Sequence, residues 1–239
     1  MKGASKEMNG QGPYSDERTA LLMKQRKELI AIRSRDVGDN MKWIFWLTII
    51  STLVNFFMAT EAVLITFGVI KYSSFVDIST IAATAIVLLC AVVYAVKLLA
   101  LRCHSESFFY AGILYGVCEL IGMAKNSIDD YAVLAVVSVI FAVLQILQLR
   151  FFVDGATSSL KEVNRNVELG WISFWRLYSK VLYAMILSAL CIFVPIINLI
   201  AILALAIIGI ISVVLSIWLV ILIWQTGTAL QNYASLAMR

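Results

Sequence analysis

The stretch VLYAMILSALCIFVPIINLIAILALAIIGIISVVLSIWLVILIW, residues 181 to 224, contains no charged side chain. A helix that crosses the roughly 30 Å hydrocarbon core of a bilayer needs about 20 apolar residues. This run is about twice that length, so we expect it to fold back on itself within the membrane. Pro195 and Asn198 are the strong turn-forming residues near its middle. They predict two helices, over about 174–196 and 200–224.

The rest of the chain has the same apolar character. Hydrophobic residues make up 62% of the 239 positions and charged residues 14%, whereas soluble domains contain roughly 45–50% and 25%. Runs with few or no charges predict four more spans, over residues 43–70, 78–97, 107–123 and 131–150. The predicted fold class is therefore all-α. We expect a polytopic integral membrane protein whose six-transmembrane helical bundle, residues 43–226, is made of three helical hairpins.

The distribution of lysine and arginine predicts the orientation of these spans, because positively charged flanks are retained on the cytoplasmic side. With the N-terminus inside, 17 of the 19 basic residues fall on the inner side, and only Lys71 and Lys125 fall outside. We therefore expect both termini in the cytoplasm and favour a bacterial inner membrane. The net charge of +4 predicts anionic lipid headgroups of the bilayer as partners, and no nucleic acid.

Residues 1–14 are rich in Gly, Ser, Asn and Gln, which predicts a disordered tail. Residues 15–42 are predicted to form a basic amphipathic helix on the cytoplasmic side. Three interpretations of this helix remain open: it lies on anionic lipid, it packs against a partner or sister chain, or it is simply solvated. Its expected contact residues are Leu22, Leu29 and Ile32, which follow helical spacing, and the neighbouring Arg26, Lys27 and Arg33.

Two further cytoplasmic segments are expected. Residues 156–170 have a helical pattern between the fourth and fifth spans, and Gly170 is predicted to end that helical segment. Residues 227–239 are predicted to be a short cytoplasmic C-terminus.

Two carboxylates interrupt the predicted spans, Glu61 in the first and Glu119 in the third. Aromatic clusters mark the inner interface. Measured from Trp43 at 1.5 Å per residue, Glu61 lies about 27 Å along its helix, near the outer interface. Measured from Phe108, Glu119 lies only about 17 Å along, near mid-depth. Ionisable residues in a membrane are candidates for titrating or ion-binding groups, although hydrogen-bonded packing carboxylates are the main alternative.

Small residues form stripes on several predicted spans, and such stripes mark faces where helices pack closely in lipid. Ser212 and Ser216 could instead line a pore. The expected packing positions are Gly112 and Gly116, beside Glu119, and Gly209, Ser212 and Ser216 on the last span.

Known catalytic patterns are absent from the sequence. The single histidine, His104, follows Cys103 but has no second ligand at metal-binding spacing, and no nucleophile elbow or phosphate-binding glycine loop is present. We therefore expect no enzyme, cofactor or metal. The leading hypothesis is a non-enzymatic membrane protein that acts through assembly, as a homo-oligomer or as the scaffold or pore-forming subunit of a membrane complex. The alternative is a proton- or cation-conducting channel or transporter that uses Glu119 with Glu61.

Overall fold

A computed structural model describes residues 13–69, 74–125, 128–191 and 198–238. Within these ranges the chain is helical and contains no strand. Five of the helices, α1, α2, α3, α4 and α6, are long and apolar enough to cross a membrane. The elements are α1 Pro13–Thr66, α2 Ser74–Ala100, the 3₁₀ turn η1 Leu101–Cys103, α3 Glu106–Lys125, α4 Tyr131–Leu160, α5 Arg165–Cys191 and α6 Asn198–Ala237.

Helix α1 is continuous from Pro13 to Thr66, where we had expected a cytoplasmic helix over 15–42 and a separate span over 43–70. Helix α1 contains no proline after Pro13, so every backbone N–H can donate its helical hydrogen bond where the polar part of the helix meets the apolar part. Of the tail predicted to be disordered, residues 1–12 lie outside the described part of the chain, and residues 13 and 14 are helical.

Helix α1 ends at Thr66, four residues before Ile70, the last residue of the expected span. Gly68 sets this end. Gly68 has φ of 70°, a left-handed conformation that glycine adopts without a steric penalty. Its N–H bonds to the carbonyl of Ile65, and the N–H of Val69 bonds to that of Leu64, both at 2.9 Å. This pair of bonds is a Schellman motif, which satisfies carbonyls that the helix end leaves free.

The break between α4 and α5 lies at residues 161–164 and not at Gly170, so the prediction of one helical segment over 156–170 is corrected. The Asn164 side chain accepts hydrogen bonds from the backbone N–H groups of Asn166 and Val167, at 3.1 and 3.2 Å, and so caps α5. Gly170 lies inside α5, where a Cβ would stand 3.0 Å from Leu222. Its small size serves close packing of α5 on α6.

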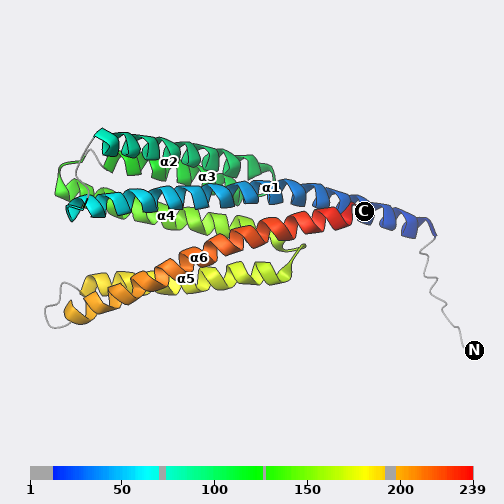
Figure 1. Cartoon of the computed structure of the whole chain (residues 1–239). Coiled ribbons are helices and arrows are strands. Elements are labelled where there is room, and N and C mark those ends of the chain that lie inside the picture. Colours follow the sequence, from blue (N-terminus) through cyan, green and yellow to red (C-terminus); the bar gives the residue numbers. More distant parts are fainter. Residues whose placement is uncertain (1–12, 70–73, 126–127, 192–197, 239) are drawn as a thin grey trace, which may run out of the picture.

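Helix α6 continues to Ala237, through most of the segment expected to be a short C-terminus. Its last part packs along α1 (Figure 1), and the two helices cross closely at two glycines. A Cβ on Gly38 would stand 3.0 Å from the carbonyl oxygen of Gly227, and one on Gly227 would stand 3.2 Å from that of Gly38. Each glycine therefore removes the side chain that would separate the backbones.

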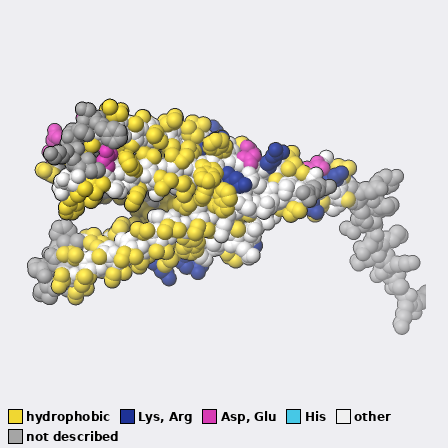
Figure 2. Space-filling model, viewed as in Figure 1, with side chains coloured by type: hydrophobic (Ala, Val, Ile, Leu, Met, Phe, Trp, Pro, Cys, Tyr) yellow, Lys and Arg dark blue, Asp and Glu magenta, His cyan; other side chains and the backbone are white. Residues whose placement is uncertain are grey.

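The helices form two arms that diverge from a shared base (Figure 1). Helices α1 to α4 make one arm, and the antiparallel pair α5 and α6 makes the other; the uncharged run 181–224 is divided between these two helices. Figure 2 shows a gap between the apolar ends of the arms. The buried core joins all six helices at the base; its largest members are Trp171, Phe108, Phe152, Phe174, Met41 and Ile44.

Candidate functional sites

Four of the five described cationic side chains that lie over aromatic rings mark one level of the fold, near its base; the fifth, Lys125 over Phe141 at 5.1 Å, lies at the far end of α3. A cation over a ring face is attracted by the ring quadrupole, and aromatic residues collect where helices cross the headgroup layer. This level therefore supplies a reference for depth along the helices. The pairs are Lys42 with Trp224 at 5.3 Å, Lys97 with Trp43 at 5.5 Å, Arg102 with Phe109 at 4.7 Å and Arg150 with Trp175 at 4.9 Å.

The expected cytoplasmic contact residues remain uncovered in the single chain. Leu22, Leu29 and Ile32 are 57%, 68% and 63% exposed. Counted from Trp43 at 1.5 Å per residue, Ile32 lies about 16 Å and Leu22 about 31 Å beyond the aromatic level, on the side away from the apolar arms. Among the basic neighbours, Lys27 and Arg33 are exposed, and Arg26 pairs with Glu162 across to the α4–α5 turn at 2.6 Å.

Glu61 lies between α1 and α2. The hydroxyl of Ser79 on α2 donates a hydrogen bond of 2.8 Å to its carboxylate. The same hydroxyl lies 2.9 Å from the carbonyl oxygen of Val76, one turn earlier on α2. Glu61 is thus part of a contact between two helices rather than a group pointing only into the surroundings.

Glu119 lies on α3, one turn beyond Tyr115, and the two side chains interact. The ring of Tyr115 packs against that of Tyr94 on α2 in a tilted arrangement, with centroids 4.4 Å apart. Below them a cavity of about 180 Å³ opens between α1, α2 and α3. The cavity is lined by Thr48, Ser51, Thr52, Tyr94 and Tyr115, with Leu47 and Cys90. The three helices therefore carry polar groups from near the base up to Glu119 and, farther along, to Glu61.

The predicted packing glycines differ in their surroundings. Gly112 is buried, and a Cβ there would stand 3.2 Å from Leu98 and Leu99 on α2. A Cβ on Gly116 or Gly209 would meet no described atom within 4 Å. Within one chain, Gly112 is thus the member of this group that lies at a helix contact, and Gly116 and Gly209 face open space.

Ser212 and Ser216 face a second cavity, of about 220 Å³, at the point where the arms diverge. Their hydroxyls donate hydrogen bonds of 2.9 Å to the carbonyls of Ile208 and Ser212. Leu149 of α4 and Tyr178 of α5 line the opposite walls. The cavity is predominantly apolar, and its two serine hydroxyls are already engaged with their own helix.

Tertiary contact also builds a cluster that the sequence did not indicate. His104 follows η1, its Nδ1 lies 3.0 Å from the sulfur of Cys103, and its Nε2 lies 3.3 Å from a carboxylate oxygen of Asp36 on α1. Burial lowers the pKa of His104 below its ordinary value; the charge of Asp36 opposes this shift, and that of Arg33 adds to it. A neutral imidazole protonated at Nε2 can donate to Asp36 and accept the thiol hydrogen.

The same three residues could hold a metal ion. One ligand atom from each of Asp36, Cys103 and His104 lies within 4.8 Å of the others. Sulfur, imidazole nitrogen and carboxylate oxygen are ligands of zinc, which takes three protein ligands in catalytic sites and four in structural ones. Sequence spacing had excluded a metal here because the third ligand comes from a helix far away in the chain.

Comparisons with protein-family models, curated proteins and solved structures found no match to this chain.

Proposed function

We propose that this chain is a non-enzymatic integral membrane protein that crosses the bilayer six times and acts through assembly, as an oligomer or as a subunit of a membrane complex. The observation that carries this proposal is the exposure of Leu22, Leu29 and Ile32 on a part of α1 beyond the aromatic level. Exposed apolar side chains in the membrane face lipid, but in water a cluster of them marks a contact site. Basic side chains interleave with this cluster, which suits an acidic partner surface.

The path of the chain supports six spans. The C-terminal part of α6 packs beside the N-terminal part of α1, so the first described residues of α1 and the last of α6 lie on one side of the base. Helix α4 reaches the base at Leu160, and α6 starts at the far end of its arm at Asn198. Helix α5 must therefore travel from the base to the far end. From Trp175 at the aromatic level to Cys191, α5 rises about 24 Å, which is most of the roughly 30 Å hydrocarbon core.

The test compares oligomeric mass in mild detergent for the full chain and the variant Leu22→Gln/Leu29→Gln/Ile32→Gln. These side chains are exposed, so the substitutions leave the core intact, and we expect the wild type to associate and the variant to lose mass. The control Leu236→Gln/Met238→Gln removes two exposed apolar side chains from the other end and is expected to associate normally. A wild-type chain that is monomeric and recovers no partner, or a triple variant that associates fully, contradicts the proposal.

A second function has support of its own. The polar groups around the α1–α2–α3 cavity, followed by Glu119 and the Ser79–Glu61 bond, are arranged as a proton or cation path would need. On this proposal Glu119 titrates and Glu61 attracts the ion at the outer end. Such a path predicts pH-dependent flux into liposomes that Glu119→Gln abolishes.

Glu106→Gln is the matched control, because Glu106 is an exposed carboxylate in the first turn of the same helix. We expect it to conduct like the wild type. Absence of flux in the wild type at every pH, or a flux in Glu119→Gln equal to that of the wild type, would contradict the proposed proton or cation path.

A further inference from the structure

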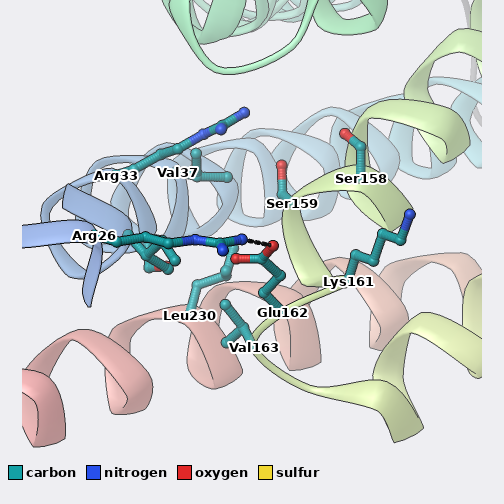
Figure 3. A pocket seen from close by; sticks show the side chains of 11 residues that line it. Arg26, Arg33, Val37, Ser158, Ser159, Lys161, Glu162, Val163 and Leu230 are labelled. Atoms are coloured by element: carbon teal, nitrogen blue, oxygen red, sulfur yellow. Dashed lines mark hydrogen bonds and ion pairs between the residues drawn. The ribbon is translucent and has the colours of Figure 1, made fainter. Parts of the chain in front are cut away.

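A basic pocket lies between α1, the α4–α5 turn and α6, on the side of the base away from the membrane arms. Its volume is about 310 Å³, at the lower end of the range for small-molecule sites. Figure 3 shows Arg33 and Lys161 extending on the same side as the hydroxyls of Ser158 and Ser159, with the Arg26–Glu162 pair opposite. The pocket therefore gathers three cations and three serines, Ser34, Ser158 and Ser159, from separate parts of the chain.

The charge of this pocket is unbalanced. Arg26, Arg33 and Lys161 face a single carboxylate, Glu162. The Arg26–Glu162 pair is solvent-accessible, with side chains 64% and 52% exposed, so it is weak and exchangeable. Within the described part of the chain, Arg33 and Lys161 form no ion pair with an acidic side chain. An incoming anion would meet two unpaired cations and could displace Glu162 from a third.

The floor and the hydroxyls limit what kind of anion fits. Val37, Val163 and Leu230 contribute apolar lining beneath the charged rim. Ser158 and Ser159 donate hydrogen bonds of 2.8 and 2.9 Å to the carbonyl of Gly155, and each hydroxyl can turn toward a ligand oxygen instead. Arginine forks and lysine ammonium groups together suit the several oxygens of a phosphate group.

A phosphate group could come from a lipid headgroup or from a dissolved ligand, and the distance of the pocket from the aromatic level distinguishes the two. Val37, the pocket residue of α1 nearest to Trp43, lies about 9 Å beyond it, and Arg26 lies about 26 Å beyond it. Lipid headgroups lie at the aromatic level, so most of the pocket is outside their reach. A dissolved ligand has free access from the aqueous side.

We propose that the pocket between α1, the α4–α5 turn and α6 is a binding site for a small phosphate-bearing anion. A bound anion would tie the cytoplasmic part of α1 to the α4–α5 turn more firmly than the exposed Arg26–Glu162 pair does. Because Arg26 and Arg33 alternate along α1 with Leu22, Leu29 and Ile32, the ligand would also fix the helix that carries the exposed apolar cluster. Binding does not depend on the assembly proposed above and is measured separately.

The experiment titrates inorganic pyrophosphate into the full chain in phosphatidylcholine nanodiscs and follows the heat of binding at constant ionic strength. We expect saturable binding that Arg33→Gln and Lys161→Gln each weaken by about tenfold, the effect of losing one charge-assisted hydrogen bond. Arg35→Gln is the matched control. It removes the same charge two residues along the same helix, but Arg35 does not line this pocket.

A second arm repeats the titration in nanodiscs that also contain phosphatidic acid. Unchanged pyrophosphate affinity assigns the site to a dissolved ligand, whereas competition that Arg33→Gln relieves assigns it to a lipid phosphate; both support the site. Thermal unfolding of each variant confirms that the fold is intact. No saturable binding in the wild type, or the same loss in Arg35→Gln as in Arg33→Gln, overturns the proposal.

Discussion

A buried hydrogen bond between Trp171 and Thr226 joins α5 to α6 at the base. Removing it tests how much this contact stabilises the fold. The indole N–H of Trp171 on α5 donates to the hydroxyl of Thr226 on α6 at 2.8 Å, and both residues are completely buried. The same hydroxyl donates 2.8 Å to the carbonyl of Leu222. Trp171 also packs edge-on against Phe152 of α4, with centroids 5.6 Å apart. One side chain thus connects three helices, including both helices of the second arm.

Removing one partner leaves the other buried and unsatisfied. Thr226→Val keeps the shape but orphans the indole N–H, which costs about 1–3 kcal/mol. Trp171→Phe removes the donor together with part of the ring and is expected to cost a similar amount or more. In the double variant the donor is absent, so the valine no longer orphans a polar group. The double variant should therefore lose about 1–2 kcal/mol less unfolding free energy than the sum of the two single losses.

The assay is unfolding in mild detergent, by heat and by titration with a denaturing detergent. For a chain of this size about 1 kcal/mol corresponds to 2–4 °C, so Thr226→Val should lower the midpoint by several degrees. Thr157→Val is the control, because the Thr157 hydroxyl bonds only to carbonyls of its own helix, at 3.0 Å. Additive losses within about 0.5 kcal/mol, or a Thr226→Val chain as stable as the wild type, would refute the reasoning.

Two further predictions concern the titration of His104 and the packing of glycines on α3 and α4. Because burial lowers the folded-state pKa of His104, the unfolded state binds the proton more readily; stability is then fully present above about pH 6.5 and falls as the pH drops below it. His104→Gln should flatten this fall between pH 7.5 and 5.5 in thermal unfolding, and an unchanged slope would contradict the assignment. Gly155→Ala should cost about 1–3 kcal/mol, because its Cβ would stand 2.8 Å from the ring of Phe108. Gly116→Ala, at an open helical position, should be neutral or stabilise by up to about 1 kcal/mol, and equal losses at both glycines would contradict the packing.

Charges indicated the ends of α3 well, but α4 runs to Leu160, past the expected end of its span at Arg150, and the lengths of the outer helices were not predicted. The span expected over 107–123 lies in α3, Glu106–Lys125, because the charged residues at its ends do not enter the apolar region. The continuity of α1 across Trp43 and the extension of α6 past Trp224 were not predicted. A change from apolar to polar residues indicates where a helix passes from lipid into water. The helix can continue through this point when no proline interrupts its hydrogen bonds.

The clusters were less accessible to sequence reasoning than the helices. Asp36 is distant in the chain from Cys103 and His104, and Arg33 is equally distant from Lys161, so no local spacing links them. Their proximity depends on the crossing of α1 and α6 at Gly38 and Gly227, which fixes how α1 lies over the base. The sequence indicated packing glycines only within the predicted membrane spans. Gly38 and Gly227 lie outside those spans and serve the contact between α1 and α6.

The position of the core implies where this fold is rigid and where it can adapt. The fully buried aromatic side chains lie at the base, whereas the far ends of the arms present mostly exposed apolar residues. The Ser212 cavity lies where the arms diverge, so a change in their separation would alter this cavity while the Trp171 contacts stay in place. A partner that packs on α6 at Gly209, where a Cβ would touch nothing, could approach the helix backbone closely. The proposed assembly in the membrane and the proposed contact at the N-terminal part of α1 are therefore compatible, because both involve parts of the chain that the core leaves uncovered.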